Sequence, residues 1–115
     1  MSKDLSVSIL IDFYGQLLTE KQAEALDLYY NDDLSLSEIA DVMEISRQGV
    51  RDFIKRGEKQ LAEYEAKLGL AGRFTQIKAK LEDINKLVKT LRVSMGDKEE
   101  LNKIESLVKT ISDKV

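Results

Sequence analysis

The chain has 115 residues, of which 43% are hydrophobic and 34% are charged, and its net charge is −3. This length suits one compact domain but not two domains of full size. It contains no histidine, cysteine, proline or tryptophan, which excludes disulfides, c-type haem attachment, histidine-dependent nucleophiles and every common zinc ligand except carboxylates. We therefore expect neither an enzyme nor a cofactor site. Because no apolar run approaches the ~20 residues of a membrane span and no signal peptide is recognisable, we also expect neither membrane insertion nor secretion.

The apolar residues recur at intervals of three and four, which indicates an all-α protein. The first predicted helix covers residues 5–17, and the second covers residues 20–30 with Thr19 as its N-cap. The inward-facing residues are predicted to be Leu5, Ile9, Leu10, Phe13 and Leu17 in the first helix, and Ala23, Leu26 and Tyr30 in the second. The acidic turn that follows, residues 31–33, is typical of a solvated loop rather than a metal site.

Two further helices are predicted on either side of a tight turn. Residues 35–38 (Ser-Leu-Ser-Glu) have the spacing of a capping box, so a short helix of about eight residues begins there. Ser46 is the expected N-cap of a fourth helix over residues 47–68, which would be about 33 Å long at ~1.5 Å per residue. Gly69 and Gly72 are expected to end it.

A short capped helix joined to a longer one by a tight turn indicates a helix-turn-helix, whose second helix enters the DNA major groove. The positions that such a domain would bury are Ile39, Met43, Ile45, Val50 and Phe53. Arginine can donate two hydrogen bonds to the edge of guanine, and glutamine can hydrogen-bond adenine. Basic side chains farther along the helix contact phosphates, as do hydroxyl or N–H groups at the start of a helix. The predicted DNA-binding residues are Ser37, Ser46, Arg47, Gln48, Arg51, Lys55 and Arg56. The alternative is that these residues form a solvated helix surface.

The remaining sequence, residues 71–115, carries two heptad patterns separated by a glycine turn at residues 96–97. The apolar positions, spaced alternately by three and four, are Phe74, Ile77, Leu81, Ile84, Val88, Leu91 and Met95, and then Leu101, Ile104, Val108, Ile111 and Val115. This spacing predicts a helical hairpin or a short coiled coil. We therefore expect a helix-turn-helix domain over residues 1–70 that continues into a hairpin over residues 71–115. Leu87 and Leu107 widen the apolar surface beyond a two-helix seam and favour a homodimer, but the spacing leaves open whether the hairpin packs within one chain.

Three segments carry a family resemblance. Residues 18–22 (LTEKQ), 36–40 (LSEIA) and 45–51 (ISRQGVR) resemble the region-four helix-turn-helix of sigma factors. The chain over about residues 5–110 is more similar to the YlxM-like family of small bacterial helix-turn-helix proteins. The resemblance implies a cytoplasmic regulatory protein that binds DNA, in which Arg47, Gln48 and Arg51 occupy base-facing positions. It also implies a role in the signal recognition particle pathway, which is proposed for the family because its genes lie near that particle's GTPase.

The distribution of charge favours a second function. Residues 1–46 hold two basic and ten acidic side chains, a net charge of −8, whereas residues 47–70 carry +2 and residues 71–115 carry +3. DNA affinity depends mainly on the neutralisation of phosphates, and most DNA-binding domains are basic. The sequence therefore leaves two functions open: a DNA-binding regulator, expected to act as a dimer, and a helical adaptor for a protein or ribonucleoprotein.

Overall fold

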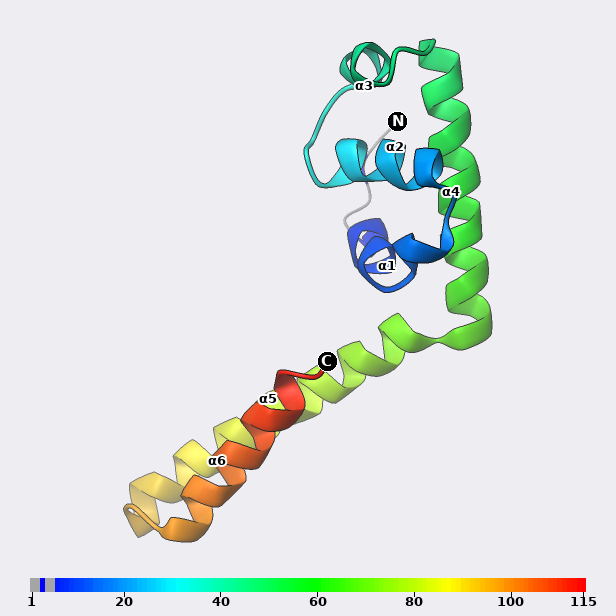
Figure 1. Cartoon of the computed structure of the whole chain (residues 1–115). Helices are drawn as coiled ribbons and strands as arrows, with labels where there is room; N and C mark the ends of the chain where they lie inside the picture. The colour runs from blue at the N-terminus through cyan, green and yellow to red at the C-terminus, as the bar shows by residue number, and fades with distance from the viewer. Residues whose placement is uncertain (1–2, 4–5) are drawn as a thin grey trace. The chain divides into compact units, whose positions relative to one another are not determined.

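The computed structural model describes residue 3 and residues 6–115, and Figure 1 shows that these residues form helices joined by short turns. In chain order the helices are α1 (Ser6–Tyr14), a 3-10 turn (Gly15–Leu17), α2 (Glu20–Tyr30), α3 (Leu36–Met43), α4 (Arg47–Leu68), α5 (Leu70–Met95) and α6 (Glu99–Ser112). No strand occurs in the described part of the chain. The structure thus confirms the all-α prediction, including the long fourth helix and the helical hairpin.

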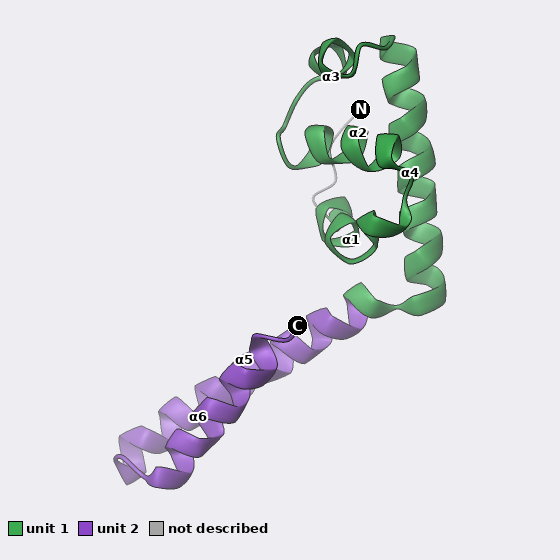
Figure 2. Ribbon diagram, viewed as in Figure 1, with its two compact units in different colours: residues 1–71 green, residues 72–115 purple. Residues whose placement is uncertain are grey.

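The chain divides into two compact units, residues 1–71 and residues 72–115, which Figure 2 shows in separate colours. In the first unit, α1, α2 and α3 all contact α4. Its core consists of Tyr14, Leu18, Ala25, Leu26, Tyr29, Ile39, Ala40, Val50, Ile54 and Leu61. Helix α4 is therefore the element against which the rest of this unit is assembled.

Local capping explains where the helices of the first unit begin. Thr19 and Ser35 each form a capping box: the side-chain oxygen accepts from the backbone N–H three residues later, and Gln22 or Glu38 returns a bond to the cap's own N–H. The Ser46 hydroxyl oxygen accepts from the backbone N–H of Gly49 at 3.0 Å. These bonds satisfy N–H groups that the first turn of a helix leaves without partners. Helices α2, α3 and α4 consequently begin where the sequence predicted.

Two tyrosines attach the neighbouring helices to α4. The hydroxyl of Tyr30 donates to Glu58 Oε1 at 2.5 Å, and the hydroxyl of Tyr14 donates to Glu65 Oε1 at 2.6 Å. The Tyr14 oxygen also accepts from the backbone N–H of Leu70 at 3.0 Å. Burial, together with the bond to Glu65, raises the pKa of Tyr14 above its usual value. The same tyrosine therefore fills the core and caps the start of α5.

The structure corrects several sequence-based assignments. Tyr14 is the buried side chain of α1, whereas Ile9 and Leu17 are exposed. Leu17 departs from the predicted pattern because α1 ends at Tyr14 and the chain continues as a 3-10 turn. In α2, Ala25 and Tyr29 are buried with Leu26, and Tyr30 is only partly covered. Gly69 ends α4 in the left-handed region at φ 62°, but Gly72 lies inside α5. Leu5 lies outside the described residues.

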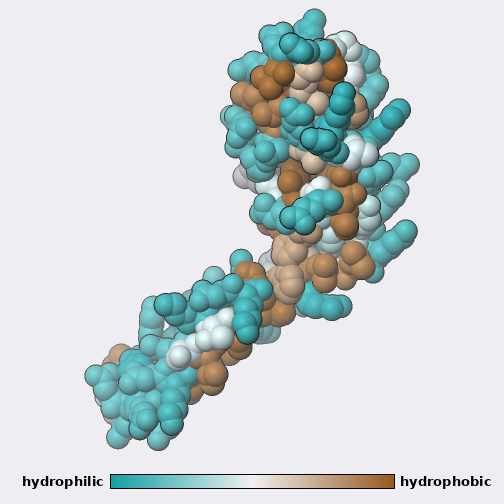
Figure 3. Space-filling model, in the orientation of Figure 1, coloured by the Kyte–Doolittle hydropathy of each residue, from teal (hydrophilic) through white to brown (hydrophobic). Residues whose placement is uncertain are grey.

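The second unit is a hairpin that α5 and α6 form within one chain, and the guanidinium of Arg92 joins the two helices. Arg92 Nε donates to Glu105 Oε1 at 2.9 Å, its Nη2 donates to Asn102 Oδ1 at 2.7 Å, and its Nη1 donates to Asp97 Oδ1 in the turn at 2.9 Å. Gly96, at φ 73°, allows the turn that separates α5 from α6. The buried seam consists of Leu81, Val88, Leu101 and Val108. Figure 3 shows hydrophobic surface continuing along one edge of this unit.

Candidate nucleic-acid interface

The turn between α3 and α4 fixes the start of the longer helix against the shorter one. Glu44 ends α3 in the left-handed conformation, at φ 57°, and the backbone N–H of Ile45 bonds the carbonyl of Ala40 at 3.1 Å. Ile39 of α3 and Val50 of α4 are completely buried on the shared side of the two helices. The first turns of α4 therefore pack on α3 with one side and expose the opposite side to solvent.

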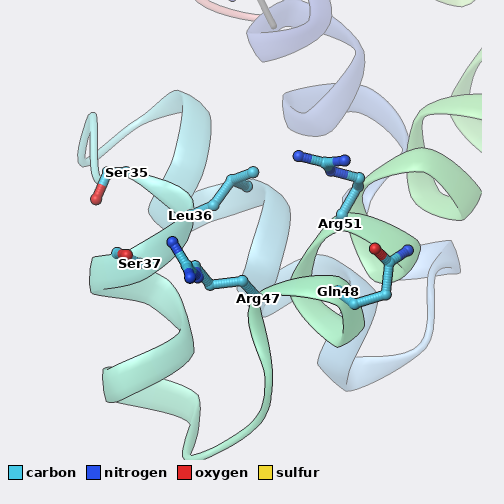
Figure 4. A pocket seen from close by; sticks show the side chains of 6 residues that line it. All are labelled: Ser35, Leu36, Ser37, Arg47, Gln48 and Arg51. Atoms are coloured by element: carbon cyan, nitrogen blue, oxygen red, sulfur yellow. The ribbon is translucent and has the colours of Figure 1, made fainter.

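A shallow depression of about 450 Å³ lies between the beginning of α3 and the beginning of α4. It is lined by Ser35, Leu36 and Ser37 from α3 and its cap, and by Arg47, Gln48 and Arg51 from α4. Figure 4 shows the Arg47 side chain extending toward the α3 end of the depression, with Arg51 and Gln48 on the α4 side. The structure thus brings together four of the seven predicted residues, namely Ser37, Arg47, Gln48 and Arg51.

The basic residues of α4 form a stripe because they are spaced by four. Arg47, Arg51 and Lys55 are all exposed, and each is rotated by only ~40° from the previous one around a helix of 3.6 residues per turn. Among the described residues, neither arginine of this stripe forms an ion pair. Two guanidinium groups at the depression are therefore available to a ligand.

The other predicted residues have different surroundings. The Ser46 oxygen is occupied as the cap of α4, although its hydroxyl proton remains able to donate. Gln48 Nε2 donates to Asp52 Oδ1 at 3.1 Å, so this amide must exchange that bond before it can contact a base. Arg56 lies away from the depression and instead lines a second hollow with Gln22, Lys59, Gln60 and Glu63. A rotation of ~100° per residue accounts for its separation from Lys55.

Two acidic side chains are hydrogen-bonded to residues that line the depression. Glu38 accepts from the backbone N–H of Ser35 at 3.0 Å, and this bond lowers the pKa of its carboxyl group below the ordinary value of 4.5. The charged carboxylate therefore persists near the α3 end, where it opposes the approach of an anion. Asp52 holds a second negative charge one turn beyond Gln48. An anionic ligand at this site thus depends on Arg47 and Arg51 to offset two carboxylates.

Sequence reasoning did not place Ser35 and Leu36 at this surface. The capping box identified Ser35 as a structural residue, and only the packing of α3 against α4 brings it to the edge of the depression. Within the described residues, no group of acidic side chains has the arrangement of a metal site. The described helices include none long and apolar enough to cross a bilayer.

Comparison with known proteins identifies the family. A model of the UPF0122 family, described as "Putative helix-turn-helix protein, YlxM / p13 like", matches residues 1–110. A UPF0122 protein of Acetivibrio thermocellus is 46% identical over 114 residues, covering 96% of this chain and 97% of the relative. One from Thermoanaerobacter sp. is 44% identical over 109 residues, which is 95% of this chain and 93% of the relative. The resemblance seen in the sequence is confirmed, and the chain belongs to the UPF0122 family of YlxM/p13-like helix-turn-helix proteins.

Proposed function

We propose that this protein is a DNA-binding regulator that places the first turns of α4 in the major groove of a duplex. The observation that carries the proposal is the outward pair Arg47 and Arg51, which lies beside the start of α3 and is held there by the rigid turn between the helices. A helix-turn-helix binds in this way, with the N-terminal residues of its second helix at base edges. The family description, which names a helix-turn-helix, agrees with this assignment.

Each predicted residue has a role that its position permits. Arg47 and Arg51 lie where each can reach a guanine edge with two N–H groups, and Gln48 suits an adjacent adenine once it leaves Asp52. Ser37 at the start of α3 and Ser46 at the start of α4 donate to phosphates, as helix N-termini do. Lys55 continues the basic stripe toward the phosphate backbone. Arg56, on another side of α4, is expected to contact phosphate only when the duplex bends or a second chain contributes.

The small number of phosphate contacts favours a dimer. If one subunit makes about four phosphate contacts, the slope of log affinity against log salt is about −3.6, and such a monomer binds weakly at physiological salt. We therefore propose a homodimer in which residues 1–70 read DNA and residues 71–115 associate. We also propose a cytoplasmic location, which is what the family resemblance implies.

Selection of duplexes from a random pool at low salt tests this function. We expect enrichment of one sequence, and we expect Arg51→Ala to weaken binding of that sequence by ~1–3 kcal/mol with little effect on random duplex. Lys67→Ala is the matched control, because it removes one exposed positive charge from the far end of the same helix. Failure to enrich any sequence, or an equal effect of the two substitutions, would refute the proposal.

The acidic surface of the first unit supports a second candidate, an adaptor for a protein or ribonucleoprotein of the signal recognition particle pathway. A groove between α1 and α2 is bordered by Asp12, Glu20, Glu24 and Asp27, and none of the described residues that line it is basic. Such a surface repels nucleic acid and suits a basic protein segment. Sedimentation of this protein with the particle's GTPase, before and after nuclease treatment, tests this function. Co-sedimentation that survives nuclease supports the adaptor, and its absence contradicts it.

A further inference from the structure

The two helices of the hairpin carry an internal sequence repeat with a separation of 20 residues. Residues 81–91 read Leu-Glu-Asp-Ile-Asn-Lys-Leu-Val-Lys-Thr-Leu, and residues 101–111 read Leu-Asn-Lys-Ile-Glu-Ser-Leu-Val-Lys-Thr-Ile. All the apolar positions correspond, and the Leu-Val-Lys-Thr segment is identical. Because the first copy lies in α5 and the second in α6, one pattern occurs on both sides of the hairpin.

The environments of corresponding residues are also alike. Leu87 and Leu107 are each 64% exposed, Ile84 and Ile104 are 38% and 37% exposed, and Val88 is as deeply buried as its counterpart in α6. Thr90 and Thr110 each return a hydrogen bond to the carbonyl four residues earlier, at 3.1 Å and 3.0 Å. Residues 81–91 and 101–111 are therefore equivalent antiparallel helical segments, as an approximate two-fold axis through the hairpin would make them.

Six exposed apolar residues, three from each helix, lie on one side of the hairpin. In α5, Ile84, Leu87 and Leu91 are rotated from the buried Leu81 by ~60–120° in one sense around the helix, and the corresponding residues of α6 are rotated from Leu101 by the same amount. Antiparallel helices wind in opposite senses when viewed from one end, so equal rotations bring these residues to the same side. We call this surface the hairpin face, which consists of Ile84, Leu87, Leu91, Ile104, Leu107 and Ile111.

The width of the hairpin face exceeds what two helices need. A two-helix seam uses two apolar positions in each heptad, whereas a helix in a larger bundle uses three. In α5 the heptad position of Leu81 and Val88 is buried against α6. The heptad position of Ile84 and Leu91 and the heptad position of Leu87 remain exposed. The hydrophobic surface along this unit in Figure 3 agrees with apolar helix positions that no other helix covers. The pattern is that of half a four-helix bundle.

We propose that a second copy of this chain covers the hairpin face, so that two hairpins form an antiparallel four-helix bundle. This inference rests on the homodimer of the proposed function and assigns the surface that forms it. Because this face has its own approximate two-fold symmetry, a second copy presents the same apolar pattern in either direction along the hairpin. A two-fold dimer requires that each patch match its own copy.

Charges along the hairpin face also permit a second copy. The residues one turn before the exposed isoleucines and leucines are Lys80 and Asp83 in α5, and Glu100 and Lys103 in α6. Corresponding positions thus carry opposite charges, and the four charges cancel. Two copies of the face therefore meet without net electrostatic repulsion. A strongly basic or strongly acidic partner would gain no net electrostatic attraction from these four residues.

Multi-angle light scattering of the full chain tests the proposal. We expect a mass of about 26 kDa, twice the 13.1 kDa of one chain. The double substitution Leu87→Asp with Leu107→Asp places four carboxylates at the centre of the dimer, so we expect the dissociation constant to rise at least 100-fold. Val93→Asp is the matched control, because Val93 is 90% exposed on α5 but lies outside the hairpin face. It should leave the dimer intact.

Two outcomes would overturn the proposal: a wild-type protein that is monomeric at 100 μM, or a double variant that remains dimeric. Circular dichroism reports whether the double variant keeps its helices; if it does not, the milder Leu87→Ser variant must weaken the dimer by itself. The failure of this inference is distinguishable from that of the proposed function. Arg51→Ala changes duplex selection without changing the mass, whereas the double variant changes the mass whether or not the protein binds DNA.

Discussion

Gly57 provides the sharpest test of how α4 is held against α2. A Cβ atom at this position would lie 2.5 Å from Leu26 Cδ1 and 3.2 Å from Leu26 Cγ, and Leu26 is completely buried. In an exposed helix, replacing glycine by alanine stabilises by about 1 kcal/mol. Overpacking a core costs about 1–3 kcal/mol. We therefore expect Gly57→Ala to lower the free energy of unfolding by about 1 kcal/mol.

A double-mutant cycle with Leu26→Ala separates the two effects. Leu26→Ala removes the clashing atoms and should by itself cost about 2–5 kcal/mol. In that background we expect Gly57→Ala to stabilise the protein by about 1 kcal/mol, because only its helix propensity remains. Urea unfolding followed by tyrosine fluorescence is the assay, since all four tyrosines lie within residues 1–71. If Gly57→Ala stabilises the wild-type protein, then the close approach of α2 to α4 is wrong.

Three further predictions concern local bonds in the first unit. Ser46→Ala removes the N-cap of α4 and should cost ~1 kcal/mol in urea unfolding. Tyr14→Phe removes the hydroxyl that caps α5 and bonds α4, so the urea midpoint should fall; an unchanged midpoint would contradict the buried bond. Because the N–H of Ser35 lowers the pKa of Glu38, the α3 capping box should stabilise the fold above pH 4.5 and lose this effect as pH falls through the lower folded-state pKa. An NMR titration of the Glu38 carboxyl group checks this, and a pKa of 4.5 or higher would refute it.

The sequence predicted α2, α3 and α4 well because their ends are determined locally. The capping residues Thr19, Ser35 and Ser46 accept hydrogen bonds from backbone N–H groups only three positions later. The start of each helix is therefore recognisable from a few consecutive residues. The packing of α1 was harder to predict. Tyr14 is buried in the core, and its hydroxyl bonds Glu65, which lies 51 residues later, so no local pattern contains that contact. The 3-10 turn after Tyr14 also breaks the periodicity that assigned Leu17 to the core.

The candidate site was predictable in part. The helix-turn-helix pattern assigned Arg47 and Arg51 to the exposed part of α4, and the structure brings both to one depression with Ser37. Ser35 joins them through the packing of α3 on α4, which the sequence does not state. Arg56 was grouped with this set by charge, although its position around the helix separates it. The hairpin repeat was missed because a heptad pattern records only polarity, whereas the repeat depends on residue identity across 20 positions.

The surface formed by the starts of α3 and α4 is the proposed contact with the duplex. An NMR titration of the ¹⁵N-labelled protein with the selected duplex tests this most directly, because each backbone amide reports separately. We predict that the largest shift changes occur at residues 35–37 and 47–55, and that Arg47→Ala raises the duplex concentration needed to produce them. Saturable duplex binding that shifts residues 72–115 or the groove between α1 and α2, while residues 47–55 stay unchanged, would contradict it.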